Sequence, residues 1–294
     1  MGIHLYDKST TSHAVQHIRL APARSILKAG IPCTIYAEDA LDFMHFVPTG
    51  LFTLQILVPD ESIGQAATAV TSNGPYSQMT EPITHWREMK LFDPAQPNCF
   101  PSSIALQQLP ETVIQNPSTD EEFYVPSTIL IHPQSSFHFN MSDSAAASPL
   151  PTPPHPEDSS ILFPTICGFL DSLIATIHEP ATGIRMHRLE LMLRCYIGYL
   201  FIYSPQLRTY PRVLPDGSYI PSVQAVYDGL KEENKRMFAH SAHGSREAGA
   251  WEENVIARRN ILRQMGRLEE ADCPMPRESA AVAERTCRSA LLTK

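Results

Sequence analysis

Residues 31–60 restrict the fold of this chain more than any other segment. A short apolar run, Cys33–Tyr36, is followed by Glu38–Phe46, where alanine and leucine favour a helix. A Pro-Thr turn then leads into a second apolar run, Phe52–Val58. Short apolar runs bounded by turn residues are typical of buried strands. The segment therefore predicts a strand, a helix and a strand in succession, and an α/β (α+β) fold class for the chain.

The neighbouring residues continue this alternation. Gly30 is expected to end one helix and Asp60 or Ser62 to cap another, because glycine and small polar residues are preferred at those positions. Thr84–Pro126 is interrupted by prolines and has no clear period, so irregular structure is expected there. The further elements expected are helices over Ala21–Gly30 and from Ser62 toward Gly74, and strands near Tyr76–Met79 and Ser127–His132.

A change of composition near the middle of the chain predicts separate regions. Residues 142–160 contain five prolines among small polar residues, too little apolar surface to offset the entropy of ordering them. We expect an α/β domain over 1–141, a Pro/Ser/Ala-rich linker over 142–160 and a mainly helical region over 161–294. A proline-rich ligand for a partner domain is the alternative for the linker. Helices are expected over Ile161–His178, Arg185–Tyr203, Val223–Ala239 and Ala250–Leu268.

Charge and hydropathy narrow the class of protein. The formal net charge of −8 argues against nucleic acid as the main partner, because phosphate binding favours a basic excess. The longest apolar stretch, Leu189–Tyr203, contains Glu190 and Arg194 and is shorter than the ~20 residues that cross a bilayer, so no membrane association is expected. The N-terminus has no apolar leader, and the cysteines form no C-x-x-C pair and are interpreted as reduced thiols. A soluble, cytoplasmic protein is the expectation.

Two motifs within residues 31–60 carry a family resemblance. Ala37-Glu38-Asp39-Ala40-Leu41 stands where small nucleotidyltransferases have G-G-x-A-L, and Val47-Pro48-Thr49 resembles the G-x-P-T turn that follows it. In that family two carboxylates at i and i+2 of the next strand share a face and hold the divalent metal that bridges the triphosphate. The resemblance implies a nucleotidyltransferase-like mixed sheet with helices over 1–141.

This chain departs from the family at the metal-binding positions. When the strand is anchored on Ile56-Leu57-Val58, Thr53 and Gln55 stand where the carboxylates would be, and neither can bind Mg²⁺ with a charge. More closely, the segment resembles uncharacterised fungal nucleotidyltransferase-like proteins with a degenerate metal motif, which have I-P-x-x-x-W-G-E-D-A-L, G-V-P-T and a strand ending in L-V-P-D. The matching residues here are Asp39-Ala40-Leu41, Val47-Pro48-Thr49 and Leu57-Val58-Pro59-Asp60.

Glu38, Asp39, Asp42 and Asp60 are the candidate ligand- or metal-binding residues. The first three cluster at an expected helix start, where carboxylates also compensate the helix dipole, and Asp60 ends the neighbouring strand. Dipole compensation, a relocated metal or substrate site and an interaction surface are three alternatives for this cluster. No cofactor is expected with the degenerate motif. Mg²⁺ and a nucleoside triphosphate would be required if the site were active.

The resemblance and the departure together favour a catalytically degenerate nucleotidyltransferase-fold protein that acts as a binding or scaffold protein. A protein partner could dock on the helical region, where Arg259, Arg263 and Arg267 recur every four residues, although nearby acidic residues favour a solvated, salt-bridged face. The alternative function is an active, metal-dependent nucleotidyltransferase acting on a small molecule or a protein hydroxyl. A structural domain whose helical half mediates assembly is a third hypothesis.

Overall fold

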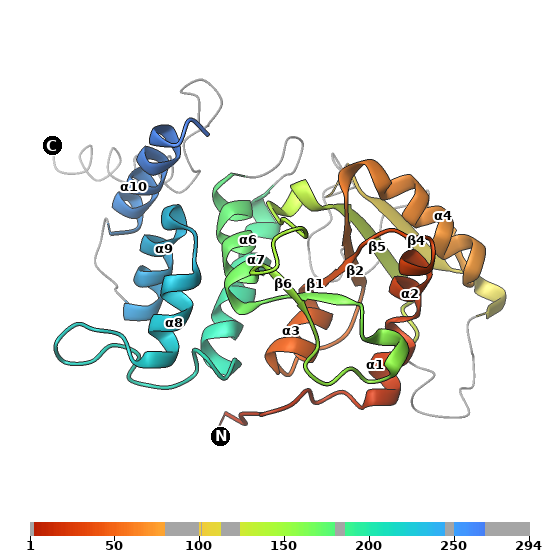
Figure 1. Ribbon diagram of the computed structural model, residues 1–294, viewed down its shortest axis with the longest axis horizontal. Helices are drawn as coiled ribbons and strands as arrows, with labels where there is room; N and C mark the ends of the chain where they lie inside the picture. Colours follow the sequence, from red (N-terminus) through yellow and green to blue (C-terminus); the bar gives the residue numbers. More distant parts are fainter. Residues whose placement is uncertain are drawn as a thin grey trace, which may run out of the picture. The chain divides into compact units, whose positions relative to one another are not determined.

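The computed structural model describes residues 3–79, 100, 102–112, 124–179, 186–244 and 250–267. The chain forms two compact units, Met1–Gly229 and Leu230–Lys294. The first unit contains a sheet with both parallel and antiparallel pairs, together with helices (Figure 1), so the mixed α/β fold class predicted from the sequence is confirmed.

The described strands form one seven-stranded sheet in the order β3-β4-β5-β2-β1-β7-β6. At its centre β2 runs antiparallel to β1 and parallel to β5, while β1 runs parallel to β7. The outer pairs β3–β4, β4–β5 and β6–β7 are antiparallel. The strands are β1 Thr34–Tyr36, β2 Leu54–Val58, β3 Tyr76–Gln78, β4 Ile104–Gln108, β5 Thr128–Pro133, β6 Ala147–Pro149 and β7 Leu162–Pro164.

Helices cover the sheet along different strands. Helix α4 lies along β3, β4 and β5 and packs on α2, whereas α3 lies along β2, β1 and β7 and packs on α7. The described α-helices of this unit are α1 His13–Arg19, α2 Ala21–Lys28, α3 Ala37–His45, α4 Ile63–Asn73, α6 Ile166–His178, α7 Met186–Tyr203 and α8 Pro221–Gly229. Its short 3₁₀ helices are η1 Asp60–Ser62, η2 Pro110–Thr112, η4 Gln134–Phe137 and η5 Pro156–Asp158.

Strand β2 is buried along its whole length, which explains why its sequence is almost entirely apolar. Side chains alternate between the two faces of a strand, so Leu54, Ile56 and Val58 share one face while Gln55 and Leu57 share the other. Gln55 is the polar residue of the strand, and its amide faces Glu38 of α3. The fold thus carries one polar side chain of β2 toward the predicted site.

Residues 31–60 fold as the sequence predicts. Strand β1, helix α3 and strand β2 coincide with the two apolar runs and the Ala-Leu segment between them. Gly30 follows α2 with φ of +77°, the left-handed conformation in which glycine commonly stops a helix. The predicted helix toward Gly74 and the strands near 76–79 and 127–132 are present as α4, β3 and β5.

Residues 142–160, predicted to be a flexible linker, instead belong to the sheet and the core. Strand β6 pairs with β7, and Asp158 is only 2% exposed, lies 2.8 Å from His17 Nδ1 and forms an ion pair with Arg24. A Cβ atom on Gly168 of α6 would lie 2.1 Å from the Ala146 oxygen, so the segment also packs closely on that helix. Prolines are compatible with this arrangement because β6 is an edge strand. A proline has no backbone N–H, but at a sheet edge this need not remove a hydrogen bond between strands.

The predicted division at 141 and 161 therefore does not match the compact units. The first unit continues to Gly229 and includes α6 and α7, which pack on each other. The apolar composition of α7 is explained by this packing, since Leu193, Tyr196 and Leu200 are buried. The helix also packs on α3, which joins it to the α/β part of the unit.

Three local predictions were also wrong. The segment expected to be irregular contains β4, which was missed because its sequence, with Leu106 as its buried residue, lacks an apolar alternation. Phe163 was expected on a helix but lies in β7, and α6 begins only after Thr165, whose hydroxyl accepts the Gly168 N–H at 3.1 Å. The helix expected over Val223–Ala239 is divided between α8 and α9.

The second unit contains α9, Glu232–His243, and α10, Ala250–Gln264, which pack on each other. Arg258 is buried and donates to Asn234 at 3.0 Å, and Arg267 pairs with Glu233. Of the three arginines that recur every four residues, Arg267 is thus paired with an acidic residue of the same unit, as expected for a salt-bridged surface. Among the described residues, none of the helices is both long enough and apolar enough to span a membrane.

Candidate functional site

The predicted site around Glu38 lies where β1 passes into α3. Tyr36 ends the strand, and Ala37, which stands at the first glycine of the G-G-x-A-L motif, has φ of +56°. Glycine adopts this left-handed conformation without the steric penalty that other residues incur. Glu38 follows with only 7% of its surface exposed. Its carboxylate is therefore directed into the protein, toward β2 and α7.

A chain of hydrogen bonds runs from this carboxylate across the sheet. Tyr196 of α7 donates its hydroxyl to one Glu38 oxygen, and Gln55 Nε2 lies 3.5 Å from the other. Gln55 Oε1 lies 3.2 Å from His132 Nε2 on β5, and His132 Nδ1 lies 2.7 Å from the Ser103 hydroxyl. We call these five residues the polar chain. It joins α7, α3, β2 and β5 through side chains that are mostly buried.

Burial sets the protonation states of the polar chain. It raises the pKa of Glu38 to about 7, although the Tyr196 hydrogen bond acts in the opposite direction. It lowers the pKa of His132 to about 3, so this imidazole is neutral at pH 7. A neutral His132 that accepts from Ser103 donates from Nε2 to Gln55, which in turn donates its amide to Glu38. The hydrogen bonds from Ser103 to Glu38 thus share one direction, and the Tyr196 hydroxyl donates to the same carboxylate from the other side.

Asp39 is held by a buried ion pair. Arg19 of α1 is 1% exposed, and its Nε and Nη2 atoms lie 2.5 and 2.8 Å from the two Asp39 oxygens. The carbonyl groups of Phe52 and Tyr124 accept from the same guanidinium at 3.2 and 3.3 Å. Burial alone would lower the pKa of Arg19, but the Asp39 carboxylate outweighs it and the pKa is raised. Asp39 therefore anchors α1 to α3.

Asp42 and Asp60 are bound by other parts of the chain. Asp42 Oδ1 accepts from the Ser9 hydroxyl at 2.9 Å and the Thr10 N–H at 3.2 Å, and Oδ2 accepts from Thr11. Burial raises the pKa of Asp42 despite these donors. Asp60 is exposed and accepts the Ser135 N–H at 3.1 Å. Asp42 thus ties the segment before α1 to α3, and Asp60 ties η1 to η4.

The four candidate carboxylates do not converge in the part of the chain that the structure describes. There, Glu38, Asp39, Asp42 and Asp60 do not provide three ligand atoms within 4.8 Å of one another. Of the two metal-motif positions, Thr53 is buried and Gln55 belongs to the polar chain. A divalent ion bound through oxygen requires several such ligands at about 2.0–2.6 Å. Each carboxylate instead has a separate structural partner.

The partners of these carboxylates could not be predicted from the sequence. A buried tyrosine hydroxyl needs a hydrogen-bond partner, so the apolar surroundings of Tyr196 indicated that one exists, but not which. Arg19 gave no comparable signal, because no periodic pattern links it to Asp39. His45, the last residue of α3, lies with Nε2 3.1 Å from the Pro164 oxygen, and burial lowers its pKa to about 4.

The site offers a titratable carboxylate, but it is enclosed by the chain's own side chains. A carboxylate with a pKa near 7 is suited to general acid–base chemistry only if a substrate can reach it. Glu38 is covered by Tyr196 and Gln55, which occupy both of its oxygens. Comparisons with family models, with curated proteins and with solved structures find no match for this chain.

Proposed function

We propose that this chain is a binding or scaffold protein built on a nucleotidyltransferase-like frame whose metal site is degenerate. The observation that carries the proposal is that each candidate carboxylate is bound by the chain itself. Glu38 is bound by Tyr196 and Gln55, Asp39 by Arg19, Asp42 by residues 9–11, and Asp60 by Ser135. Binding of a metal–nucleotide complex would require these contacts to break.

The backbone around Glu38 supports the proposal that the fold is nucleotidyltransferase-like. The order β1, α3, β2 matches the strand, helix and strand of the family resemblance. Ala37 retains the left-handed turn for which the family uses glycine, although its methyl group makes that conformation costly by about 1–2 kcal/mol. The chain keeps this costly turn although Thr53 and Gln55 stand where the family has metal-binding carboxylates. This combination fits a fold that has been retained without its metal site.

An exposed apolar face on α7 supports the binding part. Leu191, Tyr199 and Ile202 are 67%, 38% and 40% exposed, and Cys195 is exposed between them. Their spacing of three and four residues places them on one side of the helix. Apolar residues grouped on a surface often mark protein contacts. We propose that this face, defined by these four residues, contacts a protein partner through an apolar surface.

Nucleotide binding provides the first test. We expect purified protein to show no change in melting temperature with ATP, CTP, GTP or UTP, with or without Mg²⁺ or Mn²⁺, because the carboxylates are already engaged. A ligand at 100 times its dissociation constant that binds only the folded protein would add about 2.7 kcal/mol of stability, which such a titration detects readily. A metal-dependent shift that disappears in Asp39→Asn, measured relative to the melting temperature of that variant alone, would instead support the enzymatic alternative.

The α7 face provides the second test. Cys195 can carry a photo-activated crosslinker, and in an extract of the source organism we expect it to link a specific protein. That product should disappear in the double variant Leu191→Glu and Ile202→Glu, because charge on the face prevents apolar contact. A crosslinker at Gln65→Cys on the exposed side of α4, in a protein with Cys195→Ser, is the control. The same products from both positions, or products unaffected by the double variant, would contradict a role for the face.

A further inference from the structure

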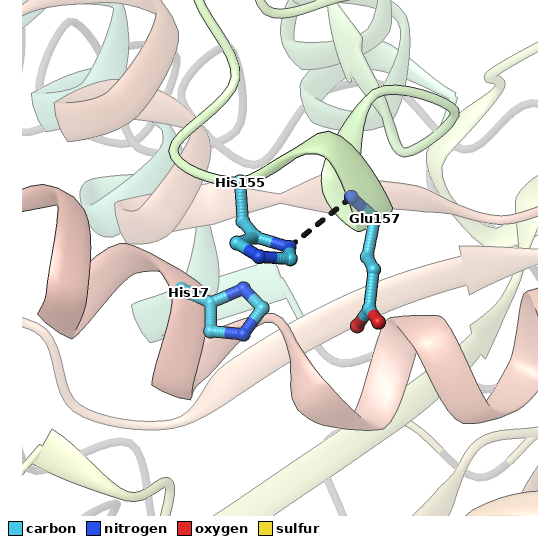
Figure 2. Close-up of side chains that lie close together, drawn as sticks. All are labelled: His17, His155 and Glu157. Atoms are coloured by element: carbon cyan, nitrogen blue, oxygen red, sulfur yellow. Dashed lines mark hydrogen bonds between the residues drawn. The ribbon is translucent and has the colours of Figure 1, made fainter.

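We propose that His17, His155 and Glu157 form a binding site for a divalent transition-metal ion of the zinc class, separate from the region around Glu38. Figure 2 shows the three side chains lying together, His17 from α1 and the other two from the turn that contains η5. Each offers one ligand atom, and these atoms lie within 4.8 Å of one another. Within the described ranges, this is the group of three such side chains that the fold brings together.

His17 is oriented as metal-binding histidines usually are. Its Nδ1 atom lies 2.8 Å from Oδ2 of Asp158, whose side chain is fully buried. Arg24 Nη1 donates to the other Asp158 oxygen at 2.6 Å and to the His17 carbonyl at 2.8 Å, and it also lies 3.0 Å from His17 Nδ1. In the tautomer that donates from Nδ1 to Asp158, His17 keeps its Nε2 lone pair for a metal, and the carboxylate fixes the ring. The buried Asp158 thus prepares His17 as a ligand.

The other two ligands, His155 and Glu157, are exposed side chains. The ring centroids of His155 and His17 lie 4.5 Å apart. His155 Nδ1 accepts the Glu157 N–H at 3.3 Å, a long bond whose loss allows either ring nitrogen to face the ion. Bonds of ~2.0–2.2 Å place tetrahedral ligands about 3.5 Å apart, so modest side-chain rotations complete the set.

The charges around the group also favour a cation. Asp158 and Glu157 are both acidic, while Arg24 is the basic side chain that reaches them, at 2.6 Å and 3.8 Å. With neutral imidazoles the ion therefore meets a negative environment. Two imidazole nitrogens and one carboxylate oxygen suit Zn²⁺, Co²⁺ or Ni²⁺ better than Mg²⁺ or Ca²⁺. Three protein ligands leave a fourth position for water.

Titration of the full-length, chelator-treated protein with Zn²⁺ and Co²⁺ tests the site. Calorimetry should detect one saturable site, and bound Co²⁺ should show visible d–d absorption typical of low coordination number. His155→Ala and Glu157→Gln should each weaken binding at least tenfold. Both residues are exposed, so the variants should fold, as circular dichroism can verify. His13→Ala is the matched control, since His13 is an exposed histidine one turn earlier on α1.

Three results would overturn the proposal. The first is absence of saturable Zn²⁺ or Co²⁺ binding by the wild-type protein. The second is unchanged affinity in both His155→Ala and Glu157→Gln. The third is an equal loss of affinity in His13→Ala, which would point to nonspecific binding by surface histidines. None of these results depends on the function proposed for the region around Glu38.

Discussion

Asp39→Asn is expected to lower the free energy of unfolding by about 3–5 kcal/mol, the range found when one partner of a buried ion pair is removed. The reason is that Arg19, 1% exposed, keeps its charge in the core while its bidentate partner is lost. The two backbone carbonyls that also accept from it cannot supply a compensating charge. Urea denaturation followed by far-ultraviolet circular dichroism measures the change.

An exposed ion pair of the same chain provides the matched control. Arg208 pairs with Asp7, whose side chain is 86% exposed, so Asp7→Asn should change stability by no more than about 1 kcal/mol. Replacing both buried partners, as Arg19→Met with Asp39→Leu, should recover most of the stability lost in the single variant, because no charge then remains uncompensated. A loss below about 1 kcal/mol in Asp39→Asn would indicate that Arg19 is solvated and that α1 is not anchored as described.

Acidification from pH 6 to pH 5 is expected to destabilise the protein by about 1 kcal/mol per pH unit, because the net uptake on unfolding approaches one proton below the pKa of 6.5 that unfolded histidines have. Burial lowers the pKa of His132 to about 3 and of His45 to about 4, from 6.5, so each binds a proton only when the chain unfolds. Burial raises the pKa of Glu38 from 4.5 to about 7, so in this pH range Glu38 is protonated in the folded state and loses its proton when the chain unfolds. On unfolding near pH 5, the two histidines therefore take up about two protons and Glu38 releases about one, which leaves a net uptake of about one proton.

Substitutions should change this pH dependence in opposite directions. His132→Gln removes one proton from the uptake and should make stability nearly constant between pH 5 and 6. Glu38→Gln removes the opposing proton and should about double the slope, to about 2 kcal/mol per pH unit. Urea unfolding at several pH values measures slopes, which do not depend on how much each variant changes stability at a given pH. Parallel slopes for all three proteins would show that these groups are solvated in the folded state.

The part of the fold that could be predicted from sequence is the part governed by local pattern. The apolar runs of β1 and β2 and the Ala-Leu segment of α3 indicate their structure without knowledge of their neighbours. Strand β4 could not be predicted in the same way, because its pairing with β3 and β5, and not its own composition, makes it a strand. Proline content was misleading for 142–160, since an edge strand tolerates prolines and Asp158 is held by distant side chains.

The candidate site was predicted in position but not in its connections. The sequence placed Glu38, Asp39 and Asp42 together at the start of a helix, and α3 begins there. Their partners come from positions as distant as Tyr196, which is 158 residues from Glu38, so tertiary structure alone reveals them. His17, His155 and Glu157 have no ligand spacing in the sequence for the same reason: α1 and the η5 turn meet only in the folded chain.

The parallel pairing of β1 with β7 determines when the first unit can form. Strand β1 lies inside the sheet only because residues after 160 return to cover one of its edges. During synthesis, the strand–helix–strand segment emerges well before that covering strand, and β1 then presents unpaired N–H and C=O groups. Exposed edges of this kind pair readily with other chains. A nascent chain of this protein, or a fragment cut at residue 141, therefore carries an aggregation risk that ends only when β7 has been added.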